Sequence, residues 1–281
     1  MMWRMPDPQP TAAFYREHGY TIFRGIVPPA LITDLRHMAE DARVIARRLE
    51  GPQAQRLQPL GEHVDLSAVR AFAALPELAA ALASVLTPRH HLNDPAKMAL
   101  LFEPAEKCWA TMWHRDWRHQ MSDEQFEQVF GVGRWARLMG DLNYFNQINC
   151  ALYEDTATWY VPGSHFRARD TPEEVRAAKS ADRAAVENWK KQRTEAEQER
   201  FLHDYCSAMP GAVQIMLNAG DLLLYRNLAW HLGSYLPYRK RATLHGNATT
   251  PEFIAFQQES APVMAKMRAN LIAAKEAGAT P

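Results

Sequence analysis

The sequence of 281 residues has little cysteine, no excess of charge of one sign and no long apolar run. Its three cysteines, Cys108, Cys150 and Cys206, lie far apart without a CxxC pair, which excludes a disulfide framework and a thiolate zinc site and indicates a reducing compartment. Because 32 Lys and Arg residues balance 32 Asp and Glu residues, we expect no basic face that would bind nucleic acid.

The most apolar stretch, residues 71–86, is interrupted by Pro76 and Glu77 and falls short of the ~20 residues that a membrane span needs. It predicts a helix pair or one kinked helix. Neither end of the sequence reads as an export or address signal. We therefore expect a cytoplasmic protein without a membrane segment, whose oligomeric state the sequence leaves open.

The pattern of the chain changes near Pro95. Before this point the sequence is mainly helical, with an amphipathic helix predicted over residues 29–49 and a short strand over residues 20–26. Beyond it, short β-branched, aromatic and alternating runs predict about eight strands, with a tight turn at Gly220-Asp221. The predicted strands are residues 97–103, 108–116, 144–152, 158–162, 212–218, 221–227, 230–235 and 241–247.

Antiparallel strands of this number and length favour a mainly β protein with flanking helices, closed as a double-stranded β-helix, the jelly-roll or cupin-like fold. We expect a single domain over residues 1–281 with its core at about 14–248. Two helical excursions, at about 117–141 and about 167–205, and a C-terminal helix at about 251–278 extend this core.

The second excursion begins with a strong helix-start signal. Thr171 fits the N-cap, Pro172 the first helical position and Glu174 the third, as in a capping box. Such an insertion in a compact sheet protein is either a solvated surface helix or a lid over a site, and the sequence alone leaves both open.

The first candidates for chemistry are His114 and Asp116, at the end of a predicted strand. Side chains two residues apart in a strand share a face, so an imidazole and a carboxylate can converge on one ion. With one distant histidine, they form the two-His-one-carboxylate set that leaves positions open on Fe(II). A hydrogen-bonded His-Asp pair without a metal is the alternative. His63 and Asp65 have the same spacing, but predict the start of a helix with Asp65 near its N-cap.

A third ligand is expected on another strand. His231 follows the predicted Gly-Asp turn and the strand after it, and Arg241 opens the next strand ten residues later. On adjacent antiparallel strands, the histidine can face a metal and the arginine a carboxylate several ångströms away. The histidines that are less favoured, because they lie in loops or lack a suitably placed arginine, are His90, His91, His119, His165 and His245.

Three further residues are candidates for contact with a substrate. Gln147 and Asn149 alternate along one face of a predicted strand, and amides that point into a sheet interior need partners, which favours a pocket. An outward polar face is the alternative. Trp159 flanks the motifs and would suit a flat or apolar substrate, although aromatic residues beside strands also fill cores.

Five motifs occur in order along the chain: F-x(4)-GY-x(4)-G, WHRDW, TWYVPGSHF, GDLLLYRNLAWHLGS and RKRATLH. Together, over about residues 14–248, they resemble the phytanoyl-CoA dioxygenase family of Fe(II)- and 2-oxoglutarate-dependent oxygenases. This resemblance implies the double-stranded β-helix, in agreement with the strand pattern. It also implies three iron ligands, which are His114, Asp116 and His231.

The resemblance further implies that a basic residue after the distal histidine binds the far carboxylate of 2-oxoglutarate. Arg239, Lys240 and Arg241 can each align with it. We favour Arg241, because it begins a strand and because a guanidinium binds a carboxylate bidentately where an ammonium does not. Arg239 is the second choice, and Ser234 is a further candidate for cosubstrate binding.

The implied activity is that of a non-haem iron dioxygenase that hydroxylates an aliphatic C–H bond of a small organic substrate, consumes O2, and releases succinate and CO2. Asp116 disfavours a halogenase, because related halogenases have a small residue at that position. Two alternatives remain: a cupin-type metal dioxygenase or isomerase that does not use 2-oxoglutarate, and a non-catalytic binding protein on the same fold. Whether the substrate is a thioester, an amino acid or a natural-product intermediate cannot be predicted from the fold.

Overall fold

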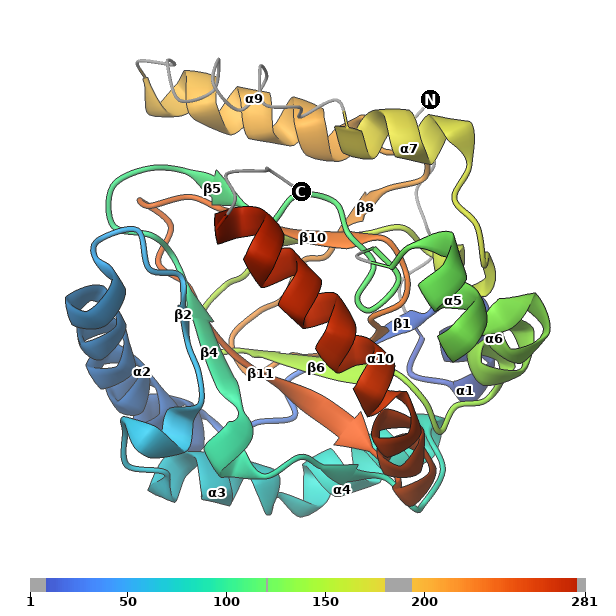
Figure 1. Cartoon of the computed structure of the whole chain (residues 1–281). Coiled ribbons are helices and arrows are strands. Elements are labelled where there is room, and N and C mark those ends of the chain that lie inside the picture. Colours follow the sequence, from blue (N-terminus) through green and yellow to red (C-terminus); the bar gives the residue numbers. More distant parts are fainter. Residues whose placement is uncertain (1–8, 120, 180–193, 277–281) are drawn as a thin grey trace.

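The structure is a computed structural model that describes residues 9–119, 121–179 and 194–276, and two antiparallel sheets form its centre (Figure 1). The strands are β1 (Tyr20–Phe23), β2 (Arg56–Leu57), β3 (His91–Leu92), β4 (Ala99–Phe102), β5 (Trp109–Ala110), β6 (Asn146–Ala151), β7 (Thr158–Tyr160), β8 (Val213–Gln214), β9 (Leu222–Arg226), β10 (His231–Tyr235) and β11 (Ala242–Thr249). The larger sheet has the order β1-β9-β6-β11-β4-β2, with β3 paired to β11. The smaller sheet has the order β5-β10-β7-β8.

These sheets confirm the predicted antiparallel β architecture with flanking helices. Every predicted run contains or overlaps a strand, and β11 pairs with β6 from Thr243 opposite Ala151 to Ala248 opposite Asn146. Two runs contain only a two-residue strand: residues 212–218 contain β8, and residues 108–116 contain β5. Met112 ends the extended conformation with a φ of 62°, a left-handed geometry that breaks a ladder and that the side-chain pattern does not reveal.

Helices cover the outer face of the larger sheet (Figure 1). Leu35, Ala39 and Ala42 of one helix are buried in the same apolar core as Leu100 and Leu244 of the sheet. This helix is amphipathic, as predicted, because its apolar residues recur at helical spacing. The helices of the first part of the chain are α1 (Ala12–His18), α2 (Pro29–Glu50), α3 (Ser67–Ala73) and α4 (Pro76–Val85), with short 3-10 turns at η1 (Leu60–Glu62) and η2 (Pro95–Lys97).

Two glycines are required by their backbone geometry. Gly19 ends α1 with a φ of 78° and donates its N–H to the carbonyl of Tyr15. Gly220 has a φ of 89°, and a Cβ there would lie 3.0 Å from the Val27 carbonyl oxygen. Asp221 donates its N–H to the Asn218 carbonyl, at 3.0 Å, which confirms the predicted turn before β9.

The first excursion contains α5 (Asp123–Val129) and α6 (Gly131–Gly140), and the C-terminal helix is α10 (Pro251–Glu276). A capping box between Ser122 and Gln125 begins α5. Aromatic residues of α5 and α6 pack against the start of α10 and form one apolar cluster with it. The residues of this cluster include Phe126, Phe130, Trp135, Phe145, Phe253 and Phe256, with Trp117 at its edge.

The second excursion contains α7 (Pro172–Lys179) and α9 (Glu195–Ser207), while residues 180–193 lie outside the described residues. The predicted capping box is present: Glu174 N donates to Thr171 Oγ1 at 3.2 Å, and Thr171 N donates to Glu174 Oε2 at 2.9 Å. In Figure 1, both helices lie along the smaller sheet. They share a core with Trp159 and Leu232, so they cover the outer face of that sheet.

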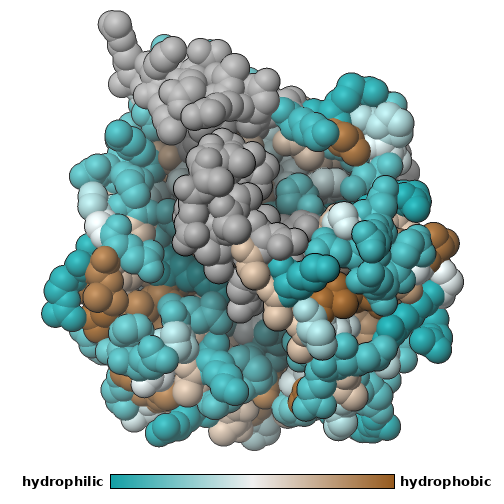
Figure 2. All heavy atoms as spheres, viewed as in Figure 1, coloured by the Kyte–Doolittle hydropathy of each residue, from teal (hydrophilic) through white to brown (hydrophobic). Residues whose placement is uncertain are grey.

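The face seen in Figure 2 is largely hydrophilic, with small, separate apolar patches where its residues are coloured. All three cysteines are free, in agreement with their spacing, and all three are buried. Among the described residues, no single helix is long and apolar enough to cross a membrane, and the bent pair α3 and α4 meets the criterion only when its two helices are taken together.

Candidate metal centre

Main-chain hydrogen bonds hold His114 against β10 and Asp116 against the loop between β9 and β10. His114 and His231 exchange two such bonds, of 3.1 and 3.0 Å, and Asp116 N donates to the Asn227 carbonyl at 3.0 Å. The prediction that these two side chains share the face of a regular strand was therefore wrong in detail. They lie on a short extended segment between two residues of positive φ, Met112 and Trp117, and pairing with β10 supplies the alignment.

Three side chains converge at this point. Asp116 Oδ1 lies 3.6 Å from His114 Nε2 and 3.8 Å from His231 Nε2. One ligand atom from each of the three residues lies within 4.8 Å of the others, and the two imidazole centroids are 4.3 Å apart. The structure thus brings together the three residues that the sequence predicted as metal ligands.

Hydrogen bonds to the main chain orient both imidazoles. His114 Nδ1 lies 2.9 Å from the Met112 carbonyl oxygen, and His231 Nδ1 lies 2.9 Å from the Ala229 carbonyl oxygen. A carbonyl only accepts, so each Nδ1 carries the proton and donates it. Each Nε2 is then left with a free lone pair toward Asp116, which is how metal-binding histidines are prepared.

Two amides orient the carboxylate. Asp116 Oδ2 accepts hydrogen bonds from Gln147 Nε2 at 2.9 Å and from Asn227 Nδ2 at 3.0 Å. These bonds occupy one oxygen and leave Oδ1 for the centre of the cluster. Gln147, predicted to contact substrate, donates its amide to Asp116 and also lines the cavity described below. Asn227 was not predicted from the sequence. The available indication was that a polar residue ends the LLLYRN run, four positions before His231.

The charge states suit a divalent cation. Burial alone would raise the pKa of Asp116, but the two nearby imidazoles and the Asn227 amide outweigh it, and the pKa lies below its ordinary value. Burial, with repulsion from His231, lowers the pKa of His114 to about 4. At neutral pH the site therefore presents an ionised carboxylate and an unprotonated imidazole, the forms that bind metal. This donor set of two nitrogens and one oxygen fits Fe(II).

The three ligands open into a cavity of about 250 Å³ between the inner faces of the two sheets, which we call the metal cavity. Both predicted amides, Gln147 and Asn149, line it. His245, which the sequence analysis set aside, lines it too, with Nδ1 2.8 Å from Asn149 Oδ1. Burial, followed by the charge of Arg56, lowers the pKa of His245 to about 3, so it is neutral.

Arg241 is the buried cation of the metal cavity. Its side chain is 6% exposed, its Nε donates to Asp155 Oδ2 at 2.9 Å, and its guanidinium lies 4.5 Å from the Tyr235 ring centroid. Among the described residues, Nη1 of Arg241 has no hydrogen-bond partner. A buried guanidinium nitrogen without a partner costs free energy unless a ligand completes it. The cavity therefore combines metal donors with a group suited to a carboxylate.

Arg239 and Lys240, the two alternatives to Arg241, lie elsewhere. Arg239 is exposed and pairs with Glu199 at 3.4 Å, and Lys240 pairs with Glu40 at 2.7 Å. Neither lines the metal cavity. The structure thus does not support Arg239, the second choice, as the residue that binds the far carboxylate of 2-oxoglutarate. The loop before β11 points its side chain toward α9.

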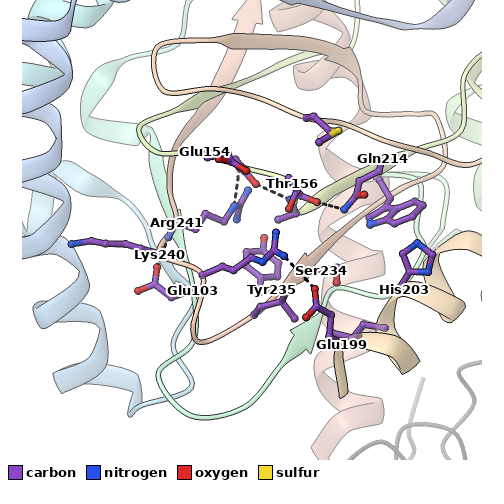
Figure 3. A pocket seen from close by; sticks show the side chains of 17 residues that line it. Glu103, Glu154, Thr156, Glu199, His203, Gln214, Ser234, Tyr235, Lys240 and Arg241 are labelled. Atoms are coloured by element: carbon purple, nitrogen blue, oxygen red, sulfur yellow. Dashed lines mark hydrogen bonds and ion pairs between the residues drawn. The ribbon is translucent and has the colours of Figure 1, made fainter. Parts of the chain in front are cut away.

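Ser234 and Trp159 also face away from the metal cavity, contrary to expectation. Ser234 is three residues from His231, so strand alternation places it on the opposite face of β10. Trp159 lies opposite Leu232 in the register of the smaller sheet and shares its outer apolar core. Both line a second cavity of about 520 Å³ between the smaller sheet and α9, which we call the outer cavity (Figure 3).

The second excursion supports the metal-site loop from outside. The Tyr205 hydroxyl of α9 accepts a hydrogen bond from the main-chain N–H of Trp113, at 3.1 Å, one residue before His114. Arg115, which lies between the ligands His114 and Asp116, is 1% exposed. It donates to the Leu228 carbonyl at 2.8 Å and to Asp170 at 2.6 Å. The described part of this excursion therefore packs behind the ligands, on the far side of the smaller sheet from the metal cavity.

Comparison with known proteins identifies a family. The profile of the family described as phytanoyl-CoA dioxygenase (PhyH) matches residues 15–234. No curated protein matches the chain. Solved structures share the fold: AviO1 from Streptomyces viridochromogenes has 16% identity and a TM-score of 0.52, with 84% of this chain and 92% of that chain covered. The iron-bound HygX from Streptomyces hygroscopicus has 16% identity and a TM-score of 0.51, with 85% of each chain covered.

A further structure with this fold is the non-haem α-ketoglutarate-dependent carbocyclase SnoK from nogalamycin biosynthesis, with 15% identity, a TM-score of 0.51, and coverage of 85% of this chain and 83% of that chain. The family match confirms the predicted resemblance. Together with the clustered His114, Asp116 and His231, it confirms the predicted cofactor set of that family: iron, 2-oxoglutarate and O2.

Proposed function

Because the chain belongs to the phytanoyl-CoA dioxygenase family, we propose that it is an Fe(II)- and 2-oxoglutarate-dependent dioxygenase that hydroxylates an aliphatic C–H bond of a small organic substrate. One observation carries this proposal: the convergence of His114, Asp116 and His231 in a cavity that is also lined by Arg241, whose Nη1 has no partner among the described residues. The two sheets are then the two walls of a double-stranded β-helix.

In this proposal, each residue has a defined task. His114, Asp116 and His231 hold the iron, and Gln147 keeps the carboxylate oriented. Arg241 binds the far carboxylate of 2-oxoglutarate. Iron with 2-oxoglutarate and O2, when bound, supplies the oxidising power for C–H cleavage, with succinate and CO2 as co-products.

The metal cavity lies between the inner faces of both sheets and positions the substrate. The side chain of His231 is 9% exposed, whereas those of His114 and Asp116 are 27% and 29% exposed, so a bound substrate would complete the exclusion of water from the metal. Trp109 and Leu101 add apolar surface, and Arg56 adds a cation. A cavity of this size and lining suits a small organic molecule. The cytoplasmic location stays a prediction.

The proposal is tested by slow turnover of 2-oxoglutarate in the absence of substrate, under labelled 18O2. We expect the purified, iron-loaded protein to release succinate that carries one labelled oxygen atom, and His231→Ala to release none. Oxygen consumption without labelled succinate would favour a cupin-type enzyme that does not use 2-oxoglutarate. A protein that binds no iron would favour the non-catalytic alternative. Once a substrate is known, a mass gain of one oxygen atom distinguishes hydroxylation from epimerisation or ring closure.

A further inference from the structure

We propose that Asp155 is the positioning residue for Arg241, fixing its guanidinium so that only the outer nitrogens are offered to the far carboxylate of 2-oxoglutarate. This inference rests on the proposed function. Asp155 lies between β6 and β7, and it lines the outer cavity while Arg241 lines both cavities. No sequence motif links Asp155 to Arg241, which lies 86 residues later in the chain.

The carboxylate of Asp155 is itself held rigidly. Its side chain is 2% exposed. Besides Arg241, its Oδ2 accepts a hydrogen bond from the Thr243 hydroxyl at 2.7 Å, and its Oδ1 accepts one from the Ala157 N–H at 2.8 Å. The main chain of Asp155 exchanges two hydrogen bonds of 2.9 Å with Leu217. A carboxylate with this many fixed donors is a stable partner for a cation, unlike a mobile surface pair.

The main chain of Arg241 is fixed independently. Its N–H donates to Glu103 Oε2 at 2.8 Å, and its carbonyl accepts from Arg43 Nη2 at 2.9 Å. Arg43 and Glu103 are paired with each other, with Nε 3.0 Å from Oε1. The helix α2 thereby anchors the residue, and the side chain of Arg241 leaves the main chain from a defined point.

An aromatic ring restrains one face of the guanidinium. The ring of Tyr235 lies over it with a centroid distance of 4.5 Å. That ring also lies over Gly233, where an added Cβ would come within 2.6 Å of it. Glycine at this position therefore leaves room for Tyr235, and Tyr235 in turn stacks on Arg241.

These contacts leave few ways for Arg241 to bind a ligand. Asp155 takes Nε and Tyr235 covers a face, so the two Nη nitrogens, of which Nη1 has no partner among the described residues, are what remains for a carboxylate. A guanidinium fixed in advance loses less side-chain entropy on binding than a free one. Because Asp155 offsets its charge, the pair suits one carboxylate rather than a more highly charged phosphate.

The test compares two keto acids in the Asp155→Asn variant. 2-Oxoglutarate and pyruvate both chelate iron through a keto acid, but only 2-oxoglutarate has the far carboxylate. Dissociation constants are measured anaerobically from the visible band of the iron-keto acid chelate. We expect Asp155→Asn to weaken 2-oxoglutarate by roughly 10-fold or more, as for removal of a buried charge partner, and to leave pyruvate within about twofold. In the Arg241→Met background, Asp155→Asn should have no further effect on 2-oxoglutarate.

Asp221→Asn is a matched control. Asp221 is also buried and pairs with an arginine, Arg24, at 2.6 Å, but neither lines the metal cavity. It should lower thermal stability and leave both dissociation constants unchanged. If Asp155→Asn does not fold, Thr243→Val removes one donor from Asp155 and should give a smaller loss confined to 2-oxoglutarate.

Two results overturn the inference: unchanged affinity for 2-oxoglutarate in folded Asp155→Asn, or equal weakening of 2-oxoglutarate and pyruvate, which would place the damage at the metal. A wild-type protein that binds iron but gives no band with either keto acid refutes the proposed function itself, so the two failures are distinguishable.

Discussion

The metal cavity and the outer cavity differ in how far their polar groups are already paired with other protein groups. The outer cavity is about twice as large, with about 520 Å³ against about 250 Å³. Yet polar side chains of the outer cavity have partners: Glu199 pairs with Arg239, and Gln214 donates to the Thr156 carbonyl (Figure 3). The metal cavity instead contains oriented lone pairs on two histidines, and it is lined by Arg241, which has a nitrogen without a partner among the described residues and also reaches the outer cavity. Unmet bonding capacity, and not size, identifies the functional site.

The same two strands build both cavities. Along β10, His231 lines the metal cavity, Ser234 lines the outer cavity, and Tyr235 lines both. Along β7, Thr158 lines the metal cavity and Trp159 the outer cavity. Strand alternation therefore gives matched residues a few ångströms apart with different expected roles, which allows paired substitutions.

The largest difference is expected for iron. His231→Ala removes a ligand, and we expect the iron content of the purified protein to fall to background. His203→Ala, in the wall of the outer cavity, should leave it unchanged. Metal analysis after anaerobic loading measures both variants. Full iron content in a folded His231→Ala protein would contradict the assignment.

The next difference separates two arginines of one loop. Arg241→Ala should weaken binding of 2-oxoglutarate by roughly 2–5 kcal/mol, the range for truncating one partner of a buried charge pair. That corresponds to about 30-fold or more in the dissociation constant. Arg239→Ala, which removes an exposed side chain from the outer cavity, should change it by less than about twofold. Titration of the chelate band measures both, and a larger effect at Arg239 would reverse the assignment.

A smaller difference is expected between one glutamine of each cavity, Gln147 and Gln214. Gln147→Ala removes a donor to Asp116, so iron affinity should fall by about 10- to 100-fold, as for other outer partners of metal ligands. Gln214→Ala removes only a hydrogen bond to the Thr156 carbonyl and should have no effect on iron. Competition with a chelator of known affinity gives both values. Equal iron affinity in the two variants would mean that Gln147 does not orient the carboxylate.

The smallest effect tests the contact between the outer layer and the ligand loop. Tyr205→Phe leaves the buried N–H of Trp113 without its acceptor, so the free energy of unfolding should fall by about 1–3 kcal/mol. Iron content should stay full, because the ligands keep their own hydrogen bonds. Chemical denaturation and metal analysis measure these quantities. Loss of iron in this variant would show that α9 controls the metal site.

Much of this arrangement could be predicted from local pattern. Alternating apolar runs predicted the strands, and His114, Asp116, His231 and Arg241 were found because ligand spacing and strand position are local properties. What could not be predicted depends on register and on backbone turns. Asp155 reaches Arg241 across the sheet, and the left-handed geometry at Met112 leaves no mark in side-chain polarity.

Some of the residues that were wrongly placed from the sequence could have been placed correctly, and others could not. The odd spacing between His231 and Ser234 already places them on opposite faces of one strand, so Ser234 could have been set aside from the sequence. By contrast, His245 has no arginine after it and reaches the metal cavity only because β11 pairs with β6 beside Asn149. The conformation of the loop before β11 also decides which of Arg239, Lys240 and Arg241 lines the metal cavity, and the local sequence does not reveal that conformation.

The most direct test of this account is an anaerobic titration of the protein with Fe(II) and then 2-oxoglutarate, followed through the weak visible band of the chelate. We predict a saturable band in the wild-type protein, its loss in His231→Ala, and a marked weakening in Arg241→Ala but not in Arg239→Ala. Iron that binds without producing a band on addition of 2-oxoglutarate, or a band that survives in His231→Ala, would contradict the account.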